Sequence, residues 1–370
     1  MQAKQYIPCA TAALFSTTAL FGASPQGNID YLNSQISRVE TETVENTWGG
    51  RNPTTRPDDC DSRGVRLYAS GDFLYWHADQ EGLDYAVTSS NPVVVDGSSL
   101  DGGRLKQPNF NWKPGFRLGL GYNIPYDQWD LYFSWTRLET EASGHVGAPT
   151  GGGLASVWLP LDTATTGPIT SARSYWHLSY DVIDLELGRS FFFTKALCGR
   201  PFLGLRGVWM NQRFDNRYSF SLLSPAATAD LRQSFHAPAL RGGLNLNWRF
   251  TNSFSFVANA SASLAYGKFN IKQDDDLPPS ATPLPSVNAR DKFHSVKANV
   301  EAALGLQWET YFSKNRYHFA LAAAYEYIDW FNQNQLTNYQ YSALGGNTFV
   351  KHLKGDLSLQ GLTLSARFDF

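Results

Sequence analysis

The charged residues whose spacing could do chemistry alternate with apolar residues in segments typical of β-strands. In Tyr180–Gly188, Asp184 and Glu186 alternate with isoleucine and leucine. Successive side chains of a strand point to opposite faces, so these charges share one face. If that face lines an enclosed aqueous interior, the charges would set its ion preference, as rings of charge do in channels. The candidate pore-lining residues are Arg117, Asp184, Glu186, Arg206, Arg241, Arg249, Lys297, Glu301 and Glu326.

The same residues permit a second interpretation, in which they pair into a salt-bridged plug. About ten strands enclose little space, because the diameter of a barrel grows with its strand number. Arg206 is the least certain member, since its segment is apolar on both faces. An open pore and a plugged or gated lumen both remain open here. Charges of both signs are present, so the pattern predicts no ion selectivity.

Histidines near predicted strand ends raise the question of catalysis. They are His77, His177, His236 and His294. A catalytic site would need a serine or a carboxylate held within hydrogen-bond distance of one of them. No Gly-x-Ser-x-Gly segment or comparable signature occurs. We therefore predict that the protein is not an enzyme.

The sequence offers no ligand-spaced Cys/His cluster, so we expect no metal site and no cofactor. The acidic triplet Asp274–Asp276 could attract Ca²⁺, although a solvated acidic loop is the simpler interpretation. Cys60 and Cys198 remain after removal of an N-terminal signal, and Cys198 is predicted in an accessible turn. In an oxidising compartment the two could pair with each other, pair between subunits or stay free.

Composition excludes several classes of protein. The 370 residues carry a net charge of −2, so no strong field would recruit nucleic acid. Beyond the N-terminus, no apolar run approaches the roughly 18 residues that suggest a membrane-spanning helix. A content of 14% aromatic residues, 31 glycines and only two methionines favours an all-β fold. The mean hydropathy of −0.33 looks soluble, but a polar lumen and loops would lower it in a membrane barrel too.

The first 64 residues do not carry the strand pattern. Residues 1–23 resemble a secretory signal, with Lys4, the apolar run Ala10–Phe21 and a cleavage residue at Ala23. From Ile29, apolar residues step by three and four, as in one amphipathic periplasmic helix or a small coiled coil that holds an oligomer together. The predicted domains are a signal peptide (1–23), a periplasmic helix with a linker (24–64) and a barrel (65–370).

From Val65 onward, about ten strands are joined alternately by tight turns and long connections. The alternation is clearest in Asn111–Asn123, His236–Phe250 and Lys292–Trp308, and the last strand ends on Phe370. Short periplasmic turns with longer external loops are the rhythm of outer-membrane barrels. The predicted fold is an all-β, transmembrane, antiparallel up-and-down β-barrel of about 10 strands (10–12). Long loops are predicted over about 142–171, 215–233 and 271–291.

Aromatic residues mark both ends of these strands. Amphipathic rings prefer the headgroup level of a membrane, so two aromatic belts are expected. A soluble β-sandwich or propeller, the competing fold, would instead bury its aromatics at mid-strand. The predicted girdle is Tyr122, Trp129, Trp135, Trp176, Trp248, Trp308, Trp330 and Phe370.

Several segments resemble one known family, the Legionella-type major outer membrane proteins, which are pore-forming barrels also found in environmental chlamydiae. The resemblance spans most of Val65–Phe370 and implies a porin-like role in the outer membrane, with cysteine cross-linking at the envelope as a further implied property. The segments that carry it are Gly71–Ala78 (GDFLYWHA), Glu81–Ala86 (EGLDYA), Tyr180–Gly188, Pro201–Gly207 and Leu240–Asn245.

These observations predict an outer-membrane porin-like channel for passive diffusion of small solutes or ions. The alternative is a structural or adhesive surface barrel with a plugged lumen and external loops that bind partners. The expected partners are outer-membrane lipid and lipopolysaccharide, and a second copy of the chain through the N-terminal helix. We expect no nucleic acid. The predicted location is the bacterial cell outer membrane, with the N-terminus in the periplasm.

Overall fold

A computed structural model describes most of the chain from residue 66 onward. The described residues are 66–91, 102–124, 129–159, 167–194, 196–221, 226–276, 288–312, 317–341 and 348–370. The predicted signal peptide, helix and linker (residues 1–64) lie outside them. In the described part, no helix has the length and apolar character needed to cross a membrane.

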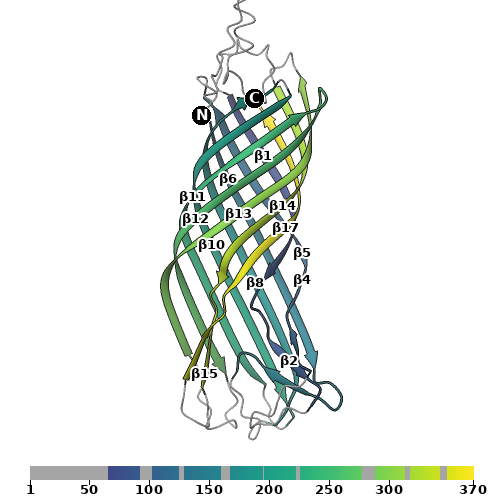
Figure 1. Ribbon diagram of the computed structural model, residues 1–370, viewed down its shortest axis with the longest axis vertical. Coiled ribbons are helices and arrows are strands. Elements are labelled where there is room, and N and C mark those ends of the chain that lie inside the picture. Colours follow the sequence, from purple (N-terminus) through teal and green to yellow (C-terminus); the bar gives the residue numbers. More distant parts are fainter. Residues whose placement is uncertain are drawn as a thin grey trace, which may run out of the picture. The chain divides into compact units, whose positions relative to one another are not determined.

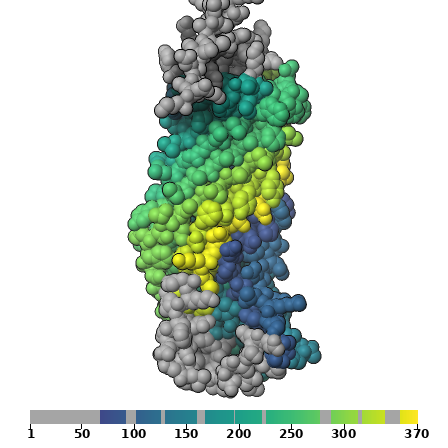
Figure 2. All heavy atoms as spheres, in the orientation of Figure 1, coloured from purple at the N-terminus to yellow at the C-terminus, as the bar shows by residue number. Residues whose placement is uncertain are grey.

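Ten long antiparallel strands of the described chain form one closed sheet (Figure 1). Each pairs with the next, and the last pairs with the first from Tyr68–Asp369 to Gln80–Leu357, which closes the barrel. Figure 2 shows the yellow last strand beside the purple first one. The predicted ten-stranded fold is confirmed. The strands are β1 (Arg66–Gln80), β5 (Trp112–Asn123), β6 (Trp129–Gly147), β8 (Ile169–Arg189), β10 (Leu197–Phe220), β11 (Ala227–Arg249), β12 (Phe254–Asp276), β13 (Asn288–Phe312), β14 (Tyr317–Asn334) and β17 (Gly355–Asp369).

Short strands lie in the connections. One group forms a three-stranded sheet, another a hairpin, and two others pair with barrel strands. The three-stranded sheet contains β2 (Ala86–Ser89), β3 (Arg104–Lys106) and β7 (Gly153–Ser156). The hairpin is β15 (Thr337–Tyr341) with β16 (Thr348–His352), while β4 (Asn109–Phe110) pairs with β6 and β9 (Phe191–Phe192) with β10.

The two ends of the barrel differ in their connections. At one end, here the short-turn end, β11 joins β12 through residues 250–253 and β13 joins β14 through 313–316. At the opposite, long-loop end, the connections at 81–111, 148–168 and 335–354 hold the three-stranded sheet, β4 and the hairpin. The predicted alternation has one exception, because β10 and β11 meet at the long-loop end through residues 221–226 alone.

The barrel strands are longer than the sequence pattern predicts. Most of the loop predicted over 215–233 is strand, since β10 ends at Phe220 and β11 starts at Ala227. The loops predicted over 142–171 and 271–291 lose residues to strands at both of their ends in the same way. These three loop predictions are therefore wrong in extent.

The physical reason is that the two faces of a strand change part-way along it: the outward face turns from apolar to polar, and the inward face turns from polar to apolar. On β10, the outward residues Leu203 and Trp209 are exposed and apolar, while Arg206 between them faces inward and is buried. Farther along, the outward Arg213 is exposed, while Phe214 is buried. The pattern of apolar residues on the outward face therefore ends before the strand does, and the rest of the strand was predicted as loop. We call the part up to the level of Trp209 the short-turn half and the rest the long-loop half.

The short-turn half carries a continuous apolar belt on its outside. About 25 cal/mol of free energy opposes each Å² of apolar surface left in water, so a belt of this size requires an apolar environment. Its exposed side chains include Leu118, Leu120, Phe133, Leu185, Leu187, Leu203, Leu205, Leu240, Leu264, Leu304, Leu306, Leu321, Leu362 and Leu364.

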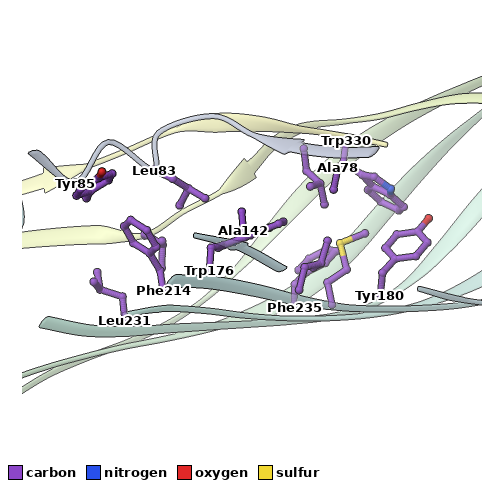
Figure 3. Packing of buried hydrophobic residues seen from close by; sticks show 14 of the residues in the cluster. Ala78, Leu83, Tyr85, Ala142, Trp176, Tyr180, Phe214, Leu231, Phe235 and Trp330 are labelled. Carbon is purple, nitrogen blue, oxygen red and sulfur yellow. The ribbon is translucent and has the colours of Figure 1, made fainter. Parts of the chain in front are cut away.

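The long-loop half is filled by buried side chains (Figure 3). Trp176 and Trp330 are fully buried there, and the rings of Phe235 and Phe269 stack at 4.4 Å. Buried amides complete the packing, since Gln212 accepts a hydrogen bond from the indole of Trp176 at 3.3 Å. Among the described residues, the interior of this half is therefore a core of packed aromatic, aliphatic and amide side chains.

Candidate pore lining

A network of ion pairs crosses the interior of the short-turn half, with Arg206 at its centre. Arg206 of β10 is 4% exposed. Its Nε donates to Oδ1 of Asp184 at 2.6 Å, and its Nη1 pairs with Glu301. Asp184 belongs to the neighbouring β8, whereas Glu301 belongs to β13, three strands away. The guanidinium therefore joins two separated parts of the wall.

Two further arginines extend this central network. Arg241 of β11 pairs with Glu186 and donates from Nη2 to Oε2 of Glu301 at 2.6 Å. Arg200 donates from Nη1 to Oε2 of Glu186 at 3.1 Å and from Nε to Oδ2 of Asp130 at 2.8 Å. The pairs thus run without interruption from β6 to β13. Buried charges of this kind persist only when their partners and hydrogen bonds are in place.

A second network lies beside the seam where the barrel closes. Arg117 of β5 holds Glu326 of β14 with both terminal nitrogens, at 3.1 and 3.0 Å. The same guanidinium donates to Asp72 of β1 at 3.3 Å and to Thr136 of β6 at 3.0 Å. A planar guanidinium suits this bidentate geometry. Arg117 therefore links four strands across the seam.

Charged residues also meet near the short-turn end. Arg249 pairs with Glu309 at 2.9 Å. Asp369 pairs with His318 and accepts a hydrogen bond from Nε of Arg367 at 2.8 Å. These residues come from β11, β13, β14 and β17. The short-turn end of the polar interior is consequently held by contacts between several strands.

All nine residues predicted to line a pore face the interior. Seven belong to the two networks, and Arg249 lies near the short-turn end. Lys297 is buried at the boundary between the halves and donates to the carbonyl of Asn332 at 2.5 Å. That these residues conduct ions stays a prediction. The prediction omitted the interior residues Asp72, Asp130, Arg200, Glu309, His318, Arg367 and Asp369, although Asp130, Arg367 and Asp369 stand on the polar faces of alternating segments.

A cavity of about 360 Å³ surrounds the networks. It has room for several water molecules, and its polar groups could hold them. The two networks contain four arginines and six carboxylates. Arg367 also lines the cavity whereas Asp130 does not, so the lining holds five arginines and five carboxylates and its formal charges balance. Besides the ion pairs, the cavity is lined by Tyr68, Ser70, Tyr132, Asn245, Asn259 and Gln307.

Gly121 of β5 provides room for an aromatic stack in this cavity. A Cβ at this position would lie 1.9 Å from the ring of Tyr68, which stacks on Tyr132 at 5.8 Å. We expect Gly121→Ala to lower the free energy of unfolding by about 1–3 kcal/mol, because the rings must move. Heat-dependent electrophoretic mobility of the folded barrel measures this. Gly71→Ala is the matched control, since its Cβ would meet nothing within 4 Å, and an equal loss in both variants would contradict the prediction.

The predicted aromatic girdle needs one correction. Trp176 and Trp330 are fully buried in the long-loop half, so assigning them to the girdle is wrong. Position near a strand end suggested them, but Trp176 shares the inward parity of Asp184 on β8. The remaining predicted girdle residues stand on outward positions: Tyr122, Trp129, Trp135, Trp248, Trp308 and Phe370.

The other candidates for chemistry do not form a site in the described chain. Cys198 lies in β10 and is 5% exposed, so its predicted accessibility is wrong. Cys60 lies outside the described residues, and the proposed pairing stays a prediction. His77 contacts the ring of Trp112 at 5.7 Å, and His294 stacks on Tyr266. The described residues hold no group of three His, Cys, Asp or Glu arranged for a metal ion.

A closed barrel with an apolar belt outside and charged side chains inside is the architecture of an outer-membrane protein, because a sheet satisfies every backbone group within hydrocarbon only when it is closed. The model of the family described as Legionella pneumophila major outer membrane protein precursor matches residues 60–370, so the chain belongs to this family. It is located in the outer membrane. By the general rule for such barrels, its short-turn end faces the periplasm.

Solved structures resemble the chain only distantly. The outer membrane protease OmpT from Escherichia coli is 12% identical, with 84% of this chain and 100% of that chain covered and a TM-score of 0.38. The toluene transporter TodX of P. putida is 9% identical (84% and 90% covered, TM-score 0.31). The CymD monoaromatic hydrocarbon channel is 11% identical (83% and 88% covered, TM-score 0.31). No curated protein matches the chain.

Asp275 gives the long-loop half a dependence on pH. It faces inward beyond the belt and is 7% exposed, with Gln273 donating to both carboxylate oxygens. Burial raises the pKa of the Asp275 carboxyl to about 7, and nearby Asp274 and Asp230 add to the rise. Because the folded state then binds the proton more tightly than the unfolded state does, stability falls as pH rises from about 4 to 7.

Replacing this carboxyl by a neutral amide should remove that cost. We expect Asp275→Asn to be more stable than the wild type by about 1–3 kcal/mol at pH 8, and to lose this advantage at pH 4. Urea titrations of the folded protein at the two pH values measure the difference. Asp274→Asn is the matched control, because Asp274 is exposed. An Asp275→Asn effect independent of pH would refute the explanation.

Proposed function

We propose that this protein is a porin-like channel for small solutes or ions and that the described conformation is its closed state. The observation that carries the proposal is the polar cavity of about 360 Å³ inside the belted half. A barrel that served only as an anchor would need no such cavity. Membership of an outer-membrane family described as major proteins supports the same role.

Two barriers close the path in this state. The first is the central network, in which Arg206 and Arg241 both reach Glu301 across the lumen. The second is the packed core of the long-loop half, where Phe235 stacks on Phe269. Ion pairs with water on one side can exchange partners, whereas the core must separate before ions pass. We therefore place the gate in the long-loop half and the selectivity in the networks.

Conductance across a planar bilayer tests this function. The purified mature protein should give discrete current steps. In a tenfold KCl gradient, Glu326→Gln should shift the reversal potential toward an anion preference relative to the wild type, because it removes one negative charge from a lining that holds five arginines and five carboxylates. A membrane that stays silent with the folded protein inserted would overturn the proposal.

A second candidate function is a structural or adhesive surface barrel. The specific observation in its favour is the three-stranded sheet of β2, β3 and β7 at the long-loop end, above a fully packed core. A silent bilayer together with cell binding that depends on residues 86–106 would support it. We also propose that the barrel has no catalytic role. Hydrolysis of a peptide or phospholipid that disappears in His177→Ala would contradict this.

A further inference from the structure

Cations form a row across four neighbouring strands on the outside of the long-loop half. The register places Arg213 of β10 opposite Arg232 of β11, Arg232 opposite Lys272 of β12, and Lys272 opposite Arg290 of β13. All four positions face outward. Like charges directly opposite each other destabilise a sheet. An anion bound over such a row would reduce this repulsion.

The charges on this wall are sorted by height above the apolar belt. In the rows between the belt and the row of Arg213, the outward charged residues of β10–β13 are Lys268 and Lys292, with His236 and His294 beside them. The acidic residues Asp215, Asp230 and Asp274 stand one row farther from the belt. Arg213 reaches up to Asp215 at 2.7 Å. We define the basic band as Arg213, Arg232, Lys268, Lys272, Arg290 and Lys292. Its other five cations also lie between the acidic row and the apolar belt.

An open apolar surface lies directly beneath the basic band. Leu264, Tyr266 and Val296 are each about 60% exposed there. Lys268 follows Tyr266 by two residues, which is about 7 Å along a strand. A molecule with acyl chains and an anionic head could therefore contact both surfaces at once.

The basic band is confined to one side of the barrel. On the opposite wall, the outward positions where the apolar stretches of β1, β14 and β17 end include His77 and Asp79 of β1, Tyr327 and Asp329 of β14, and Gln360 of β17. None of these is Lys or Arg. A general attraction to the membrane surface would not require the cations to lie on one side of the barrel, whereas a site for one bound lipid would require it.

We propose that the wall of β10–β13 binds lipopolysaccharide of the outer leaflet, with its phosphates on the basic band and its acyl chains on the apolar surface below. Guanidinium and ammonium groups are the side chains that hold phosphate. The short-turn end faces the periplasm, so the band stands at the outer-leaflet surface, where phosphorylated glycolipid lies. The inference needs the orientation of the barrel and does not need the channel to conduct.

Binding of purified rough lipopolysaccharide to the folded protein in detergent tests the site. We expect the double variant Arg232→Gln/Arg290→Gln to weaken binding by about tenfold to thirtyfold, from about 1 kcal/mol per cation near an anionic surface. Arg173→Gln/Arg217→Gln is the matched control: both are outward arginines, directly opposite each other but beyond the acidic row. It should bind as the wild type does. Electrophoretic mobility before and after heating verifies that each variant is folded.

Two more probes distinguish a phosphorylated lipid from a free phosphate polymer as the source of the anion. Lipid A lacking its phosphates should bind weakly to the wild type and should not distinguish the two double variants. Soluble polyphosphate should compete only weakly, because it lacks acyl chains. Equal losses in both double variants, or equally tight binding of the dephosphorylated lipid, would overturn the proposal. Full displacement by polyphosphate would also overturn it, because the site would then take any phosphate polymer.

Discussion

Arg206→Met is expected to lower the free energy of unfolding of the barrel by about 3–5 kcal/mol. The substitution leaves Asp184 and Glu301 buried without their shared cation, and an uncompensated buried charge costs this much. Arg206 itself is 4% exposed, so water cannot replace the lost partner without entering the network. Urea titration of the protein in lipid vesicles, followed by tryptophan fluorescence, measures the change.

A matched control separates burial from charge. Arg137 also pairs with a carboxylate, Glu139 at 2.5 Å, but it faces outward with 41% of its side chain exposed. Arg137→Met should change stability by less than about 1 kcal/mol. Adding Asp184→Asn to Arg206→Met should recover part of the loss, since one of the orphaned charges disappears. If the Arg137 and Arg206 variants lost equal stability, the central network would have no structural role.

Phe235→Ala is the second substitution with a large expected effect, here on conduction. The ring stacks on Phe269, which in turn stacks on Phe293 at 5.3 Å, in the packed core that closes the long-loop half. Its removal should cost about 3–5 kcal/mol and leave a cavity in the barrier. We expect the channel to be open for a larger fraction of the time, by tenfold or more. Single-channel recording in planar bilayers gives this fraction.

The control for this variant is a phenylalanine that meets lipid instead of the core. Phe256 of β12 faces outward in the apolar belt and is 38% exposed. Phe256→Ala should leave the open fraction unchanged, although it removes the same ring. An unchanged open fraction in Phe235→Ala would remove the gate from the long-loop half. Equal increases in both variants would point to a general loosening of the barrel.

The sequence predicts the fold well wherever one rule holds along a strand. In β11, Leu240, Leu244 and Trp248 alternate with Arg241 and Asn245, and the structure places the first set outward and the second inward. The same alternation predicts the interior position of Glu301 and Glu326. Parity alone is sufficient here, because the lipid and the lumen impose opposite requirements on neighbouring residues.

The sequence fails where the environment outside the strand changes from lipid to water. Phe214 and Tyr218 are buried inside β10, yet they lie in or next to the predicted loop 215–233. A single pattern could not show that the strand continues with its faces exchanged. The pairing of Arg206 with Glu301 was also beyond prediction, because it joins strands that are not adjacent. Parity shows whether a side chain faces the lumen or the lipid, but it does not show which residue lies opposite that side chain across the lumen.

The exchange of faces also sorts the tryptophans of the barrel into two optical populations. Trp129, Trp248 and Trp308 stand on the outside of the apolar belt, whereas Trp158 and Trp330 are sealed inside the long-loop half. Brominated acyl chains should therefore quench emission from the first group and spare the second. Fluorescence that survives bromination would follow the folding of the part of the molecule that projects from the bilayer, without any added label.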